Sequence, residues 1–260
     1  MEVVGYISLF FVGLVLGTLG GGGSILSVPI LVYLFSIDAV MASAYSLFIV
    51  GTTSLVGTFL KLNVQMVNLR VGITFGLPSL ITIFSTRKWL IPAIPEVILQ
   101  TESIIITKRF LIIGLFAVLM ILASLTLIRK RKESQSEQEY SGPYLMGVGA
   151  LTGVLTGLVG AGGGFLIIPA LVYFAKMGFK TAVGTTLLII TVNSLFGFMG
   201  DVINYQINWY FLFSVTVLAI VGIVVGTHLA VNVSNQTLRC FFGWLVLGIG
   251  TLILAKELLV

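Results

Sequence analysis

Long apolar runs separated by short polar breaks divide the chain into ten segments, five in each half, and their lengths predict helices. Three segments in each half reach roughly the 20 residues that a helix needs to cross a bilayer. Strands of a membrane barrel would instead be about 10 residues of alternating polarity, and the chain shows no such alternation. The predicted helices are 3–19, 24–36, 39–60, 70–90 and 107–128, followed by 143–159, 164–176, 179–199, 209–230 and 237–258. The pattern therefore predicts an all-α polytopic membrane protein.

The composition supports this prediction. Apolar residues make up 58% of the chain, charged residues only 9%, and the mean hydropathy is +1.15, whereas a soluble domain carries about 25% charged residues. Part of the net charge of +5 lies in Arg129-Lys130-Arg131-Lys132, directly after an apolar run, as in cytoplasmic loops. Because the sequence lacks basic patches interleaved with aromatic residues, we expect the lipid bilayer, and not nucleic acid, as a partner.

The two halves of the chain are copies of each other. Residues 13–33 recur without a gap at 153–173, and ten of these 21 positions are identical. We therefore divide the chain into a first transmembrane repeat, 1–128, a polar cytoplasmic linker, 129–142, and a second transmembrane repeat, 143–260.

The first two segments of each half are too short to cross a bilayer comfortably, and glycine-rich breaks separate them. Each pair predicts a broken-helix hairpin whose tip lies within the membrane, where non-helical backbone must be buried in protein or reached by water. The hairpin returns the chain to its starting side and leaves three crossing helices in each half. An odd number of crossings predicts two repeats that are inverted in the membrane. With the basic linker placed in the cytoplasm, both chain termini are expected outside.

The glycine-rich breaks are candidate anion sites. Glycine permits positive φ and close approach to a ligand, and a helix that restarts after the break, at Ser24 or Gly164, offers unpaired N–H groups and a positive dipole end. Interrupted segments at equivalent places in a duplicated membrane protein are typical of a transporter's binding site. Close packing of helices is the alternative role of such glycines. The candidates are Gly20, Gly21, Gly22, Gly23, Ser24, Gly160, Ala161, Gly162, Gly163 and Gly164.

Small hydroxyl and amide side chains on the following helix complete the predicted site. Neutral donors can hold an oxyanion without the cost of burying a cation, although Ser and Thr also bond the carbonyls of their own helix. The side chains selected are Ser46, Thr185, Thr186, Asn193 and Ser194. Arg70, Arg87 and Arg239 stand near predicted helix ends, where we expect them to reach the membrane interface.

The glycine-rich motifs resemble those of the sulfite exporter TauE/SafE family. The resemblance rests on the doubled pattern Gly-x-x-Gly-Gly/Ala-Gly-Gly followed by an apolar run, Pro and Leu, at 17–31 and 157–171, and on Ala-Val-Gly-Thr-Thr-Leu at 182–187. The degraded first copy of the latter, at 42–47, carries Tyr45 where a small hydroxyl residue is expected. The resemblance implies an inner-membrane permease that moves small sulfur-containing anions such as sulfite or organosulfonates, often outward.

Interrupted helices in a duplicated membrane protein predict a transporter that works by alternating access, and the family resemblance implies that it exports a small sulfur-containing anion. An anion channel and an uptake permease for another small oxyanion remain alternatives. An intramembrane enzyme would need a catalytic set at membrane depth, and the chain has one His and two Asp, the latter at helix junctions; we expect no catalytic residue and no cofactor. The single Cys240 excludes a cysteine-based metal site, and we predict no metal. A homodimer is compatible with the sequence.

Overall fold

The protein, described here by a computed structural model, is built almost entirely of helices. The structure describes residues 2–37, 39–63, 65–90, 93–95, 97–101, 104–128, 141–159, 163–202 and 206–258. The first half contains α1 (Glu2–Leu19), α2 (Gly22–Leu34), α3 (Ala39–Asn63), α4 (Leu69–Ser85), the π-helix η1 (Thr86–Leu90) and α6 (Lys108–Ile128). The second half contains α7 (Gly142–Val159), α8 (Gly164–Phe174), α9 (Phe179–Val202), α10 (Trp209–Val231) and α11 (Asn235–Leu258). The prediction of an all-α polytopic fold is confirmed.

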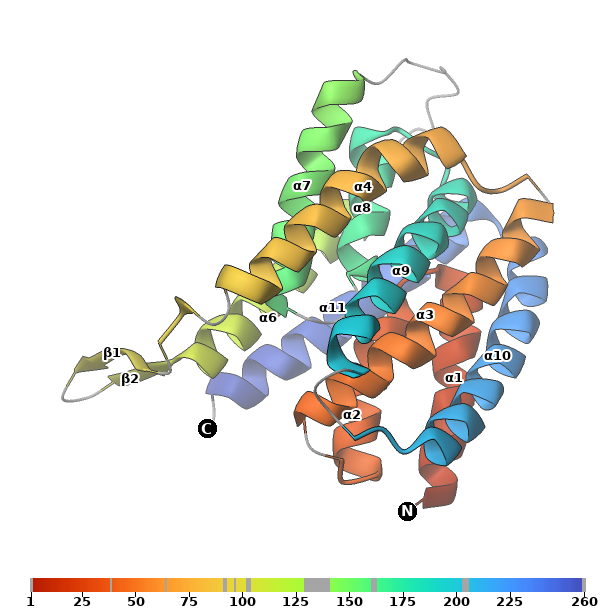
Figure 1. The fold of residues 1–260 in the computed structure, drawn as a ribbon. Coiled ribbons are helices and arrows are strands. Elements are labelled where there is room, and N and C mark those ends of the chain that lie inside the picture. The colour runs from red at the N-terminus through yellow and green to blue at the C-terminus, as the bar shows by residue number, and fades with distance from the viewer. Residues whose placement is uncertain are drawn as a thin grey trace.

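One short element was not predicted. Within the insertion of the first half, β1 (Val97–Thr101) pairs antiparallel with β2 (Ile104–Thr107). This hairpin projects from the helical body beside α6 (Figure 1). Residues 129–140 of the predicted linker lie outside the described residues, so the boundaries of the repeats stay predictions.

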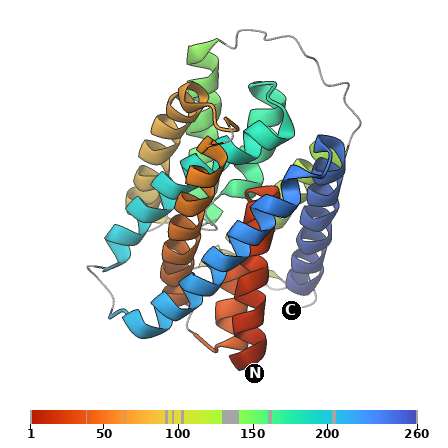
Figure 2. The ribbon, with the colours of Figure 1, turned by 90° about the vertical axis from the view of Figure 1, so that its right-hand side faces the viewer.

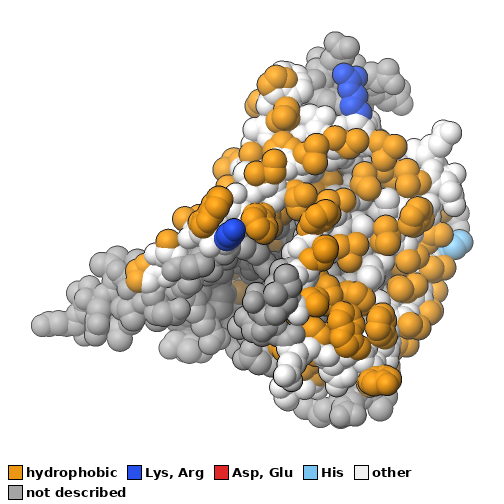
Figure 3. Space-filling model, viewed as in Figure 1, with side chains coloured by type: hydrophobic (Ala, Val, Ile, Leu, Met, Phe, Trp, Pro, Cys, Tyr) orange, Lys and Arg blue, Asp and Glu red, His pale blue; other side chains and the backbone are white. Residues whose placement is uncertain are grey.

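Helix lengths agree with a protein that crosses the membrane several times. Five helical stretches in the described part of the chain are long and apolar enough to cross: 41–63, 69–90, 179–199, 209–231 and 235–255. The helices on either side of each glycine break are shorter, as expected for hairpins. Apolar side chains are spread over the described part of the face seen in Figure 3, and on α4 the exposed side chains include Leu69, Ile73, Leu77 and Ile81. Such a surface suits lipid rather than water.

Each half packs its first helix against the fourth helix of the other half. Helix α1 lies along α10, and its equivalent α7 lies along α4. At Gly13 an added Cβ would collide with the backbone of Ala219. At Gly153 it would lie 2.8 Å from the Cα of Ser79. Both members of the second pair stand 140 positions from those of the first, so the duplication seen in the sequence extends to the packing.

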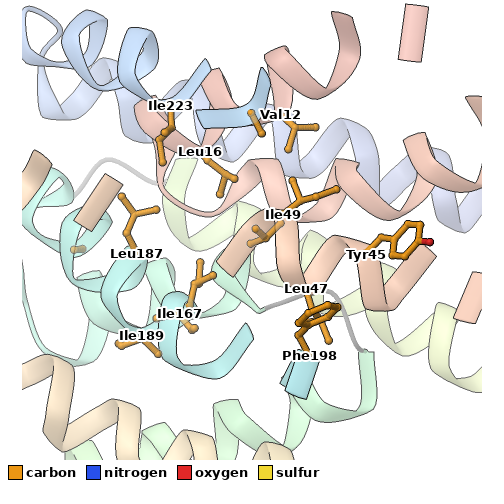
Figure 4. Packing of buried hydrophobic residues seen from close by; sticks show 14 of the residues in the cluster. Val12, Leu16, Tyr45, Leu47, Ile49, Ile167, Leu187, Ile189, Phe198 and Ile223 are labelled. Carbon is orange, nitrogen blue, oxygen red and sulfur yellow. The ribbon is translucent and has the colours of Figure 1, made fainter. Parts of the chain in front are cut away.

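The equivalent helices α3 and α9 lie side by side and antiparallel in the middle of the molecule (Figures 1 and 2). Leu47 of α3 meets Gly197 of α9, Gly51 meets Ser194, and Gly57 meets Leu187. The centre of this pairing therefore falls near residues 52–54 and 191–194. Around it, side chains from four helices form the core, including Leu16, Ile49, Leu187 and Ile223 (Figure 4).

Matching caps begin the fourth helix of each half. The side-chain carbonyl of Asn68 accepts a hydrogen bond from the N–H of Val71 at 3.0 Å, and that of Asn208 accepts one from Phe211 at 3.2 Å. Each bond satisfies an N–H group of the first helical turn, which has no partner within the helix. The cap explains why α4 and α10 begin directly after these asparagines.

Candidate functional site

The first glycine break has a defined turn. Gly20 follows the last residue of α1 with φ of +76°, and its N–H bonds to the carbonyl of Leu16 at 2.8 Å. A left-handed glycine of this kind is the usual end of a helix. Gly21 is then the N-cap of α2 and provides no side-chain cap. The helix restarts at Gly22, two residues earlier than the predicted Ser24, so Gly23 and Ser24 belong to its first turn.

The second break adopts a different conformation. Here the left-handed residue is Gly163, with φ of +70°, and it is the N-cap of α8 without a side-chain cap. Its equivalent in the first half, Gly23, lies inside α2. Gly160, Ala161 and Gly162 lie outside the described residues. The two halves therefore carry the same glycine-rich motif but restart their helices at different points.

The two breaks touch each other. A Cβ added at Gly21 would lie 2.5 Å from the carbonyl carbon of Gly164, and one added at Gly164 would lie 2.6 Å from the Cα of Gly21 and 2.6 Å from Cδ1 of Ile190. These glycines are thus needed for close packing, one of the two roles considered from the sequence. Their contact also brings the N-terminal ends of α2 and α8 together.

Adjacent helix N-termini create a positive region in the interior. Each end carries roughly half a positive charge from its unpaired N–H groups. Neither helix has an acidic residue in its first turn, and Gly21, Gly163 and Gly164 are buried. Because like ends repel most strongly away from water, the arrangement favours a negative charge beside them.

Polar side chains on α9 lie along the part of that helix that packs against the two glycine breaks. Val183 packs against Gly20, and Ile190 packs against Gly164. Between them, on the same helical face, Thr186 is 0% exposed and its hydroxyl has no partner. One turn beyond Ile190, the hydroxyl of Ser194 and the Oδ1 atom of Asn193 also lack partners, while Nδ2 of Asn193 donates to Ser79 at 3.3 Å.

The structure adds three residues to the predicted set. Thr53 and Ser54 of α3 are the repeat equivalents of Asn193 and Ser194, and both have buried hydroxyls without a partner. Thr156 of α7 lies against Gly163, and its hydroxyl is also unpartnered. Buried polar atoms are rarely left unsatisfied in proteins, so this cluster marks a place for a polar ligand or water. The repeat offset of 140 residues already relates Thr53 to Asn193 and Ser54 to Ser194 in the sequence.

Three of the predicted side chains already have partners. Ser46 bonds to Ser27 at 2.5 Å between their hydroxyl oxygens, and Ser24 donates to the carbonyl of Gly21 at 2.8 Å. The hydroxyl of Thr185 accepts from the N–H of Asn68 at 3.0 Å. Their role toward a ligand stays a prediction.

Tyr45 in the first half and Thr185 in the second make equivalent hydrogen bonds to the backbone of the opposite half. Its hydroxyl accepts a hydrogen bond from the N–H of Asn208 at 2.9 Å, and Asn208 is the repeat equivalent of Asn68. Although Tyr45 departs from the family pattern, its hydroxyl makes the same hydrogen bond as that of Thr185. The α3–α9 pair therefore has an equivalent bond at each of its two ends.

Not all of the basic side chains near helix ends reach the membrane interface, although the sequence predicts that they do. Arg70 is exposed, as expected, but Arg239 is only 8% exposed and its Nε atom has no partner. The side chain of Arg87 lies outside the described residues. Lys61, near the end of α3, is only 2% exposed. A position near a helix end does not ensure that a side chain reaches the interface when neighbouring helices cover it.

Comparison with known proteins identifies relatives over nearly the whole chain. The family model described as Sulfite exporter TauE/SafE matches residues 6–253. A probable membrane transporter protein of Xylella fastidiosa is 28% identical over 257 residues, which cover 95% of this chain and 92% of the relative. Another from Methanocaldococcus jannaschii is 30% identical over 206 residues, covering 76% and 71%. The probable membrane transporter protein YunE of Bacillus subtilis is 26% identical over 262 residues, covering 89% and 90%.

No solved structure matches the chain. The family match, the relatives and the apolar helices agree on a multi-pass membrane protein that acts as a transporter. The chain belongs to the sulfite exporter TauE/SafE family.

Proposed function

We propose that the protein exports a small sulfur-containing oxyanion, sulfite or an organosulfonate, across the inner membrane. The observation that carries the proposal is the contact between Gly21 and Gly164. It joins two positive helix ends beside buried hydroxyls that have no partner. The family description supports sulfite as the first substrate to test.

The chemistry of the cluster suits an anion. Unpaired N–H groups of the first turns of α2 and α8 would donate to its oxygens, and Thr186 and Ser194 would add hydroxyl donors. Asn193 can add a further donor if its side-chain amide is rotated by 180°. In that orientation Oδ1 accepts a hydrogen bond from Ser79 and Nδ2 faces the unpartnered hydroxyls. The two orientations occupy the same space, because the amide oxygen and nitrogen simply exchange places. Two helix ends of about half a charge each offset much of a single negative charge.

Alternating access is supported by the relation between the halves. The equivalent helices α3 and α9 run antiparallel, and the α1–α10 and α7–α4 contacts repeat residue by residue. Repeats inverted in the membrane, as we propose for this chain, can exchange conformations by rocking around a fixed site at their interface. The same geometry puts the contact of the two glycine breaks close to the centre of the α3–α9 pair.

Transport by purified protein in liposomes tests the proposal. Uptake of radioactive sulfite should saturate, and sulfite preloaded inside should accelerate it by counterflow. Sulfate, thiosulfate, sulfoacetate and acetate serve as competitors that define the substrate class. Saturable uptake without counterflow acceleration would indicate a channel. Inhibition by acetate as strong as by thiosulfate would contradict selectivity for sulfur oxyanions.

A further inference from the structure

A buried lysine lies outside the cluster at the glycine breaks. Lys61 is among the largest fully buried side chains of the described residues, at 2% exposed. Within that part of the chain it makes no hydrogen bond or ion pair. Another cation, Lys180, acts on it electrostatically. The ammonium group of Lys180 donates to the carbonyl of Val231 at 2.8 Å. A lysine side chain that merely follows an apolar surface to water keeps its head exposed, whereas the Lys61 residue as a whole is only 2% exposed.

The residues that surround Lys61 follow from the contacts made one helical turn earlier in α3. One turn earlier, a Cβ at Gly57 would meet Cδ1 of Ile223 on α10 at 2.5 Å and Cδ1 of Leu187 on α9 at 3.1 Å. Because α3 runs parallel to α10 and antiparallel to α9, the next layer contains Lys61, Thr227 and Gly184. The contact of 3.3 Å between Cβ of Lys61 and the Cβ position of Gly184 agrees with this layer.

Thr227 provides a second unsatisfied group in the layer. It is buried, and its hydroxyl has no partner. Its backbone N lies 2.7 Å from the Cβ position of Gly17, near the end of α1. The layer where α1, α3, α9 and α10 meet therefore contains a buried cation, Lys61, and a buried hydroxyl without a partner, that of Thr227.

We propose that Lys61 and Thr227 form a second anion site, which receives the transported oxyanion on its way to or from the glycine breaks. The proposal rests on the anion transport proposed above. An anion there would neutralise Lys61 and relieve its repulsion from Lys180. The site lies seven residues beyond Ser54 on α3, about 10 Å along the helix. Val183, the neighbour of Gly184, packs against Gly20 and links the two sites.

The second site belongs to one mouth of the transporter only. The repeat equivalent of Lys61 is Asp201, so the sequence reverses the charge in the other half. An anion is therefore attracted at the end of the bundle where α3 ends and α9 begins. In the orientation predicted from the basic linker, this end faces the cytoplasm, from which an exporter takes its substrate.

Equilibrium binding of radioactive sulfite to the purified full chain tests the second site. We expect two sulfite ions per wild-type chain and one for Lys61→Gln, whereas Lys61→Arg, which retains the charge, keeps both. Thr227→Val should weaken the second site by roughly tenfold, the loss of one hydrogen bond to a charged ligand. The exposed Arg70→Gln serves as a matched loss of charge and should bind two ions.

The outcomes separate the two proposals. One sulfite ion per wild-type chain, unchanged in Lys61→Gln, would overturn the second site and leave the glycine site intact. Loss of an ion in Lys61→Gln, together with wild-type affinity for both ions in Gly164→Ala, would support the second site and contradict the glycine site. Equal losses in Lys61→Arg and Lys61→Gln would overturn the role of the charge.

Thermal unfolding in detergent provides a readout that does not depend on counting ions. Without sulfite, Lys61→Gln should unfold no lower than the wild type, because it removes a buried charge that lacks a partner. Sulfite should raise the unfolding temperature of the wild type more than that of Lys61→Gln. Lower stability of Lys61→Gln without sulfite, with an unchanged response to sulfite, would show a structural role and refute the second site.

Discussion

Adding one methyl group at Gly164 should separate the two glycine breaks. In Gly164→Ala, the new Cβ would lie 2.6 Å from the Cα of Gly21 and 2.6 Å from Cδ1 of Ile190. The Ile190 side chain can rotate, but the Gly21 backbone is held by the turn at Gly20. Reaching an ordinary contact of 3.4 Å therefore requires α2 and α8 to move apart by about 0.8 Å.

Gly164→Ala should change both the stability of the protein and its affinity for sulfite. Overfilling a packed region costs about 1–3 kcal/mol, and the higher helix propensity of alanine returns up to about 1 kcal/mol. If the displacement breaks one hydrogen bond to a charged ligand, the loss is about 1.5–3 kcal/mol. This corresponds to roughly a tenfold to hundredfold rise in the sulfite dissociation constant.

Sulfite binding and thermal unfolding should be measured on the same preparations of Gly164→Ala. Gly147→Ala is a matched control, because Gly147 also lies in a helix next to the second break and nothing lies within 4 Å of its Cβ position. We expect the control to bind and transport sulfite like the wild type. Wild-type affinity in Gly164→Ala, with the protein folded, would refute the view that the touching breaks form the anion site.

Four further substitutions separate effects on sulfite binding from effects on stability. Thr186→Val, which removes an unpartnered hydroxyl, should raise the sulfite dissociation constant roughly tenfold with little change in thermal unfolding; unchanged affinity would exclude Thr186 as a ligand. Tyr45→Phe should lower the free energy of unfolding by about 1–3 kcal/mol, because it leaves the Asn208 N–H without its acceptor, and Thr185→Val should do the same to Asn68. Chemical or thermal unfolding measures both, and a stable Tyr45→Phe would show that water replaces the bond. Asn68→Ala should cost about 1 kcal/mol through loss of the α4 cap, and an unchanged unfolding temperature would contradict that role.

Much of the architecture follows from the sequence alone. Apolar runs of roughly 20 residues predict crossing helices because the bilayer sets their length, and the predicted limits of α3, α9 and α10 agree with the structure within a few residues. The duplication predicts equivalent elements, and the Asn68 and Asn208 caps occur where it puts them. Glycine runs likewise mark the breaks, because few other residues end a helix with positive φ.

The tertiary structure decides which polar groups remain available. Neighbouring threonines that look alike in the sequence differ in their hydrogen bonds. The hydroxyl of Thr185 is bonded to the backbone of the opposite half. The hydroxyl of Thr186, the next residue, has no partner and faces the glycine breaks. A one-residue step turns a side chain by about 100° around a helix, and only the position of neighbouring helices tells what it meets. Likewise Lys61 stands in the sequence as an ordinary cation at a helix end, whereas in the structure it is buried and α9 packs against it at Gly184. Contacts between segments over 100 residues apart have no local signal in the chain, so these choices depend on the fold.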